Sequence, residues 1–139
     1  MLGVSNEQRL MDRLWEKADE KFELPPEIAD RYFEYSGPTP VHVDNRRAFH
    51  RYYLRTKTVI EKEGLTLGIY TTDISRQGIG FLCSRQLLPK ERFQLVLPNG
   101  TTCQLEIARC RRTKHNYYEC GGRFALANFQ DAHLSEGQL

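Results

Sequence analysis

The sequence lacks any long uninterrupted run of apolar residues. No stretch approaches the roughly 18 residues that a membrane-spanning helix requires, and the N-terminus does not show the basic and then apolar pattern of a secretory signal. We therefore expect a cytoplasmic protein with no membrane span. With 139 residues, 40% of them hydrophobic, the chain is long enough to bury the core of one domain.

The sequence also lacks metal-binding and catalytic patterns. No two of the four cysteines (Cys83, Cys103, Cys110 and Cys120) have the spacing of a zinc or redox motif, so we expect reduced, structural thiols. We find no nucleophile–base pair, no cluster of histidines and carboxylates at ligand spacing, and no glycine-rich loop that would cradle a phosphate. These absences predict a protein that is not an enzyme and holds no metal or cofactor.

The net charge is only +2, because two oppositely charged parts of the chain nearly cancel. Residues 1–45 carry five Lys or Arg against ten Asp or Glu, whereas residues 46–139 carry fifteen against eight. A basic body of this kind favours anionic partners such as a nucleotide, a nucleic acid or an acidic protein surface.

Helical patterning is confined to the acidic part of the chain. After a capping box formed by Ser5 and Gln8, apolar residues recur every four positions, which predicts a helix over residues 5–23. Those apolar residues are Leu10, Leu14, Ala18 and Phe22, with Met11 and Trp15 beside them. Two prolines end this helix, and the second of them, Pro26, can open a shorter helix that reaches residue 35.

From residue 53 onward the apolar pattern has a period of two, which is typical of strands. Asn99-Gly100 is a strong hairpin signal between two of the expected strands. We expect six strands, over residues 53–61, 65–73, 79–83, 93–97, 103–107 and 118–124. Because only short turns join them, the sequence predicts a mainly β fold, a six-stranded antiparallel (split) β-barrel that closes on itself.

These patterns divide the chain into three parts. We expect an acidic helical arm over residues 1–36, a linker over 37–45 and the barrel domain over 46–139, which ends in a short helix or coil over 126–134. The arm can pack permanently on the barrel, form a homodimer through its apolar stripe, or change its contacts when a ligand binds. The sequence leaves these three roles open.

Two short motifs carry the functional information. The first is R-x-x-x-R with an additional arginine before it, and the second is D-x-S-x-x-G. R-x-x-x-R alone is a weak signal, since it occurs three times here; we interpret Arg55, which ends one of the other copies, as an exposed cation on a strand. The candidate binding residues of the two motifs are Arg46, Arg47, Arg51, Asp73, Ser75 and Gly78.

In their order and spacing these motifs resemble those of a PilZ domain, the bacterial receptor module for cyclic di-GMP. The resemblance extends from residue 46 to about residue 126 and includes Gly80-Phe81 and Gly122-Arg123-Phe124. It implies that the arginines bind phosphate or guanine, that Asp73 accepts hydrogen bonds from the guanine N1–H and N2–H₂ groups, and that Ser75 adds a hydroxyl contact. It further implies that Gly78 allows close approach of the ligand.

Arg46 stands directly before the R-x-x-x-R motif. The resemblance implies that this position influences whether one ligand or a stacked pair is held, and a third guanidinium there favours two cyclic di-GMP molecules per domain. We therefore expect an effector that changes conformation on binding and signals to an unidentified protein partner, for example in motility or biofilm regulation.

Two other functions remain as alternatives. A small basic barrel could bind single-stranded nucleic acid through stacking on Tyr52, Tyr53, Tyr117 and Tyr118. Because these tyrosines occur as adjacent pairs, the two members of each pair point to opposite faces of a strand and do not form one stacking platform. We therefore regard nucleic-acid binding as the less favoured hypothesis. The second alternative is a protein-interaction module whose nucleotide site is vestigial.

Overall fold

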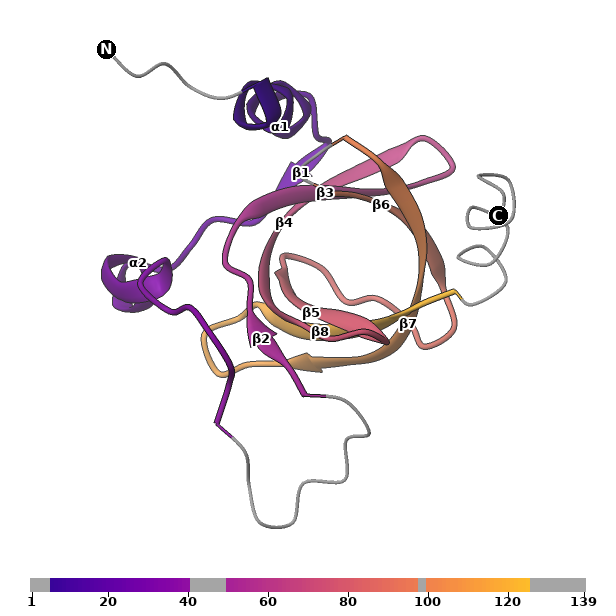
Figure 1. The fold of residues 1–139 in the computed structure, drawn as a ribbon. Helices are drawn as coiled ribbons and strands as arrows, with labels where there is room; N and C mark the ends of the chain where they lie inside the picture. The colour runs from indigo at the N-terminus through magenta and orange to yellow at the C-terminus, as the bar shows by residue number, and fades with distance from the viewer. Residues whose placement is uncertain (1–5, 41–49, 98–99, 126–139) are drawn as a thin grey trace, which may run out of the picture.

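A computed structural model describes residues 6–40, 50–97 and 100–125. These ranges contain two helices, α1 (Asn6–Glu16) and α2 (Pro26–Tyr32), and eight strands (Figure 1). The strands are β1 (Glu20–Lys21), β2 (Tyr52–Tyr53), β3 (Lys57–Lys62), β4 (Leu65–Ile74), β5 (Gly78–Cys83), β6 (Arg92–Val96), β7 (Thr102–Arg112) and β8 (Tyr118–Phe124).

Six of the strands close into an antiparallel barrel, seen end-on in Figure 1. Their order around the ring is β4-β3-β6-β7-β8-β5, and β5 pairs again with β4 to complete it. The predicted mainly β class and six-stranded antiparallel barrel are therefore confirmed. The two shortest strands lie outside the ring, where β1 pairs with β4 in parallel and β2 pairs with it antiparallel.

The barrel is filled by the alternating apolar side chains that the sequence pattern indicates. One core cluster contains residues from β3 to β8, and eight of its Ile, Leu and Phe residues are no more than 1% exposed. These are Ile60, Leu67, Ile69, Ile79, Phe81, Leu95, Leu105 and Ile107.

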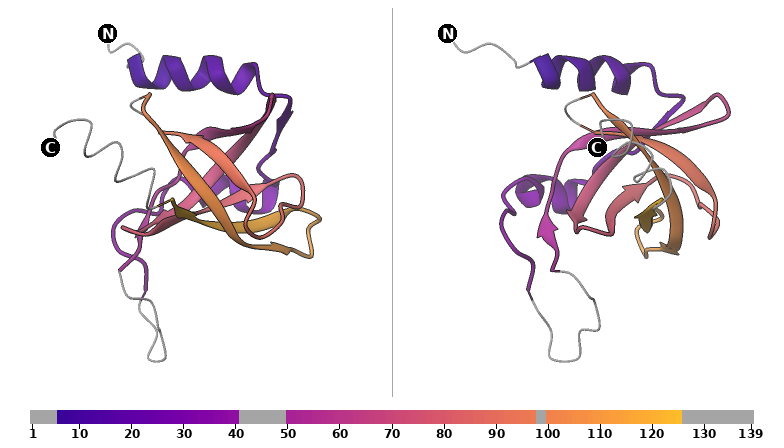
Figure 2. Two further views of the ribbon diagram at one scale, coloured as in Figure 1. Left: turned by 90° about the vertical axis from the view of Figure 1, so that its right-hand side faces the viewer. Right: turned by 45° about the vertical axis from the view of Figure 1, so that its right-hand side comes forward.

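The helices cover apolar residues on the outside of the barrel wall. Met11, Leu14 and Ala18 pack against Val59 of β3 and Val96 of β6, and Figure 2 shows α1 lying along this wall. Val59 is next to the core residue Ile60, so it points to the opposite face, where α1 buries it completely. The described part of the arm is thus packed on the barrel.

The first helix is shorter than the sequence predicts. It ends at Glu16 rather than at residue 23, and after a turn over residues 17–19 the chain forms β1. The reason is a pair of hydrogen bonds to the free edge of β4, in which Asp19 N donates to Thr66 O and Thr66 N donates to Asp19 Oδ2, both at 2.8 Å. Phe22 is still buried, against Tyr32 and Leu82. The second helix likewise ends at Tyr32, before the predicted residue 35.

Several predictions fall on residues outside the described ranges. They are Ser5 of the capping box, Asn99 of the hairpin and the helix or coil over 126–134. The division into arm, linker and barrel domain stays a prediction. Within the described ranges, no helix has both the length and the apolar character needed to cross a bilayer.

Candidate functional site

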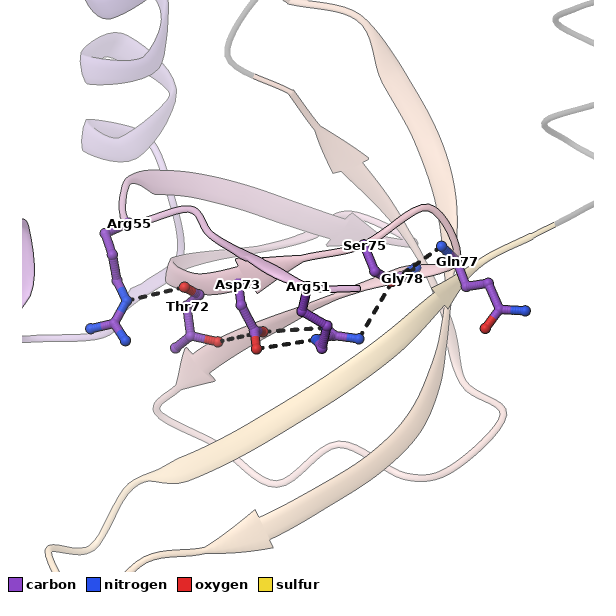
Figure 3. A network of polar contacts seen from close by, with 7 residues as sticks. All are labelled: Arg51, Arg55, Thr72, Asp73, Ser75, Gln77 and Gly78. Atoms are coloured by element: carbon purple, nitrogen blue, oxygen red, sulfur yellow. Dashed lines mark hydrogen bonds and ion pairs between the residues drawn. The ribbon is translucent and has the colours of Figure 1, made fainter. Parts of the chain in front are cut away.

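Arg51 and Asp73 meet at the edge of the barrel although they are 22 positions apart in the chain. The short strand β2 brings them together, because it pairs with the end of β4 and places Tyr53 opposite Asp73. Arg51 Nε donates to Asp73 Oδ2 at 3.1 Å, and Arg51 Nη2 donates to Asp73 Oδ1 at 3.2 Å (Figure 3). The pair is bidentate and largely shielded, with side chains only 14% and 22% exposed, which is the geometry in which such a contact is strongest.

Ser75 belongs to the same site. Arg51 Nη1 lies 3.5 Å from Ser75 Oγ, and this oxygen also accepts hydrogen bonds from the backbone N–H groups of Gln77 and Gly78. Ser75 N donates to Gly78 O at 2.9 Å, which closes the turn between β4 and β5. In the three contacts of its hydroxyl, Ser75 Oγ is the acceptor, so the O–H hydrogen can be donated to an anion or a guanine oxygen.

Gly78 has a packing reason to be glycine. A Cβ atom at this position would lie 2.1 Å from the carbonyl oxygen of Gly122 in β8, far inside any normal contact distance. The close approach that the structure records here is therefore between two strands of the barrel. The predicted contact of Gly78 with a ligand stays a prediction.

The direction of the Asp73 carboxylate depends on two residues that we did not single out for this purpose. Thr72 is the extra residue of a β-bulge, since Thr71 pairs with Phe81 and Asp73 pairs with Gly80; bulges of this kind re-aim a side chain. Thr72 Oγ1 donates to Asp73 Oδ1 at 3.2 Å. A Cβ on Gly80 would lie 2.5 Å from Asp73 Oδ1, so only glycine leaves room for the carboxylate. Alternation of apolar residues gives no signal for a bulge.

Arg55 differs from its predicted role as an exposed strand cation. It lies between β2 and β3, is half-buried, and donates from Nε to the carbonyl oxygen of Thr72 at 3.0 Å. Its guanidinium also lies over the rings of Tyr32, Tyr35 and Tyr53. The prediction failed because two of these partners, Tyr32 and Tyr35, come from the arm, whose contacts with the barrel no local pattern reveals.

The remaining candidates are placed as follows. Arg46 and Arg47 lie outside the described residues. Among the four tyrosines considered for base stacking, only Tyr52 is exposed, at 51%. Tyr53 packs on Arg55, Tyr117 packs on Phe22, and Tyr118 packs against the barrel core. These four side chains do not form one stacking surface.

A cavity of about 530 Å³, with Thr72 in its lining, lies between α2 and the barrel. Tyr32, Tyr35 and Arg55 line it together with the carboxylates of Glu27, Asp30 and Glu119. Its three carboxylates outnumber its two arginines, Arg31 and Arg55, which disfavours the binding of a phosphate there. Within the described ranges, no group of three or more His, Cys, Asp and Glu side chains could hold a metal ion.

Comparison with known proteins identifies the family to which this arrangement belongs. A family model described as PilZ domain matches residues 45–135, a range that includes both motifs and all six strands of the barrel. The chain belongs to the PilZ domain family. PilZ domains are receptor domains that bind cyclic di-GMP, and their barrel is the fold observed here.

Among solved structures, the chain is similar to the Bacillus subtilis inhibitor of motility, MotI/DgrA, with 17% sequence identity and a TM-score of 0.48. The match covers 70% of this chain and 54% of that one, so the chain spans about half the length of its structural neighbour. A comparison with curated proteins finds no match.

Proposed function

We propose that this PilZ domain is a cyclic di-GMP effector whose ligand site consists of Arg46, Arg47, Arg51, Asp73, Ser75 and Gly78. The observation that carries the proposal is the bidentate Arg51–Asp73 contact beside the Ser75 hydroxyl. A cation, a carboxylate and a hydroxyl lie together in this corner of the barrel, which supports the binding of a phosphate and of the guanine N–H edge there.

The contacts between Arg51 and Asp73 hold both side chains in a fixed orientation for this ligand. A guanidinium has five N–H donors and a carboxylate has about four acceptor positions, and only three donors of Arg51 are used in the contacts to Asp73 and Ser75. Asp73 therefore fixes the plane of the Arg51 guanidinium while donors remain for a phosphate or for the O6/N7 edge of guanine. Asp73 already accepts from Arg51 Nε, Arg51 Nη2 and Thr72 Oγ1, so about one acceptor position remains, on Oδ2. It serves guanine N1–H or N2–H₂, and a contact with both groups would replace one of the three present hydrogen bonds.

Calorimetric titration with cyclic di-GMP tests this assignment. Arg51→Ala or Asp73→Ala should each weaken binding by roughly 2–4 kcal/mol, the range of an interface hot spot, which is tens-fold or more in affinity. Arg92→Ala is the matched control, because Arg92 forms an ion pair with Glu106 on β6 and β7, away from the site. Unchanged affinity in the two site variants would contradict the assignment of the site. Competition between an oligonucleotide and cyclic di-GMP would favour the hypothesis that the barrel binds nucleic acid.

Two ligand molecules per domain are part of the proposal. Arg46 supplies a third planar cation beside the motif, which can stack on a base and offset the repulsion between phosphates. The same titration should therefore saturate at two ligands per chain, and saturation at one would contradict the role given to Arg46.

We further propose that ligand binding changes the contacts of the N-terminal arm and so signals to a protein partner. The basis is that α1 and α2 already lie on the barrel that holds the site. Hydrogen exchange of residues 6–35 should change when cyclic di-GMP is added, and identical exchange would contradict the switch. The four cysteines are free thiols, in keeping with a cytoplasmic location, which is also part of this proposal.

A further inference from the structure

The contacts of Arg55 connect the N-terminal arm to the strand that carries Asp73. Its guanidinium carbon lies 4.4 Å from the ring centroid of Tyr32 and 4.8 Å from that of Tyr35, within the range of cation–π attraction. Its Nη1 atom lies 3.5 Å from the carbonyl oxygen of Tyr32, at the long limit of a hydrogen bond. Arg55 thus contacts the end of α2 and the residues after it through cation–π attraction and a long hydrogen bond.

The other side of Arg55 holds the β-bulge. Nε donates to the carbonyl oxygen of Thr72, the bulge residue, which also accepts a hydrogen bond from Leu54 N at 3.1 Å. Tyr32, which is 3% exposed, donates from its hydroxyl to the carbonyl oxygen of the preceding residue, Thr71. The end of α2 and Arg55 together therefore bind two consecutive carbonyls directly before Asp73.

From the bulge the contacts continue into the ligand site, as Figure 3 shows. Thr72 Oγ1 donates to Asp73 Oδ1, and the same oxygen accepts from Arg51 Nη2. A shift of the Thr72 backbone would move both the hydroxyl donor and the carboxylate that depends on it. Both side chains already lie against Gly80 of β5, where an added Cβ would be 2.5 Å from Asp73 Oδ1 and 2.7 Å from Thr72 Oγ1.

We propose that Arg55 is a positioning residue for ligand binding, which holds the Thr71–Thr72 bulge in place and couples the docking of α2 to the orientation of Asp73. The inference rests on the proposed cyclic di-GMP site and adds a residue that lies outside both motifs. Coupling between two sites is reciprocal in binding free energy. Ligand binding should therefore stabilise the docked position of α2 by the same factor by which docked α2 favours the ligand.

The hydrogen bond of Arg55 to Thr72 and its stacking on the tyrosine rings both require the planar guanidinium group. Lysine would keep the positive charge and much of the stem, but it cannot donate from two separated nitrogens while stacking on tyrosine rings. Arg55→Lys is therefore the informative variant, and Tyr32→Phe is the second, because it removes only the hydroxyl that binds Thr71. Arg92→Lys is the control, since Arg92 is an exposed arginine with its own carboxylate partner.

Calorimetry of the full chain with cyclic di-GMP tests the proposal. We expect Arg55→Lys and Tyr32→Phe to weaken binding about tenfold while the proteins remain folded by circular dichroism, with no change for Arg92→Lys. Adding Arg55→Lys to Asp73→Asn should cost little beyond Asp73→Asn alone, because Arg55 acts through Asp73. In the wild type, ligand should slow amide hydrogen exchange of residues 26–32, and this protection should be reduced in Arg55→Lys.

Each result bears on a separate claim. Wild-type affinity in Arg55→Lys, or losses that add fully in the double variant, would overturn the positioning role and leave the proposed function standing. A wild-type protein that does not bind cyclic di-GMP would overturn both.

Discussion

At the scale of single residues, Gly78 has the strongest requirement for its identity. An alanine Cβ would lie 2.1 Å from a backbone oxygen of β8, and backbone cannot rotate away as a side chain can. We expect Gly78→Ala to lower the free energy of unfolding by at least about 2–3 kcal/mol, as overpacking in a core does. Thermal or chemical unfolding measures this, with Gln77→Ala as the control at the exposed neighbouring position. Wild-type stability of Gly78→Ala would contradict the observed spacing of β5 and β8.

Glu91 gives a prediction on pH. Its carboxylate accepts hydrogen bonds from Leu88 N and Lys62 Nζ, both at 2.7 Å, and these contacts lower its pKa below the ordinary 4.5. Because the folded-state pKa is lowered, the stabilisation is fully present above the ordinary value and is lost as the pH falls through the folded pKa.

Glu91→Gln should therefore cost about 1 kcal/mol near neutral pH, and the difference from wild type should vanish in acid. Urea unfolding of both proteins across this pH range is the measurement. Glu61→Gln is the control, because Glu61 is an exposed residue of β3, the strand that also carries Lys62. A difference that persists unchanged at low pH would show that the ion pair is not its source.

At the scale of elements, the barrel strands could be predicted because each shows its inward face as alternating apolar residues. The two strands that were missed, β1 and β2, have two residues each and exist only because the edges of β4 accept them. Leu10, Leu14 and Ala18 do mark the buried face of the arm, but the same spacing continues to Phe22 after the backbone has become extended. Periodicity therefore gave the burial of these residues correctly and the end of the helix incorrectly.

The candidate site shows the same limit. Arg51, Asp73 and Ser75 could be recognised from motif residues, and the structure brings them into contact. Arg55 and Thr72 could not, because their importance comes from a bulge and from contacts with α2 that are distant in sequence. Motifs name the residues that touch a ligand, whereas the residues that orient them emerge only from the fold.

The contact between α1 and β4 can be tested through the only tryptophan. Trp15 lies over Gly68, where an added Cβ would be 2.9 Å from its ring, and its edge meets Tyr70 at 5.3 Å between centroids. We expect Gly68→Ala to displace Trp15, shift its fluorescence emission to the red and destabilise the protein by about 1–2 kcal/mol. Gly64→Ala is the control for the emission alone: no atom lies within 4 Å of a Cβ there, but φ at Gly64 is +86°, so alanine strains the backbone and lowers stability without touching Trp15. Unchanged emission would mean that Trp15 does not rest on Gly68.

At the scale of the whole molecule, the acidic arm and the basic barrel are joined mainly by apolar contacts. Asp12 pairs with Lys57 and Glu20 pairs with Arg85, but all four side chains are more than a third exposed. Ion pairs of this kind contribute little and are screened by salt. Burial of Met11, Ala18, Val59 and Val96 therefore supplies most of the attachment of α1.

The attachment of α1 also bears on whether the protein forms a dimer. The stripe that could join two arms is already covered by the chain's own barrel, so a dimer through the same residues would require α1 to leave it. Met11→Asp places a carboxylate in this contact and should speed hydrogen exchange of residues 6–16, whereas Arg13→Asp, on the exposed side of α1, should leave that exchange unchanged. We expect light scattering to give the mass of one chain for the wild type and both variants. A wild-type dimer that Met11→Asp dissociates would show instead that the stripe acts between chains.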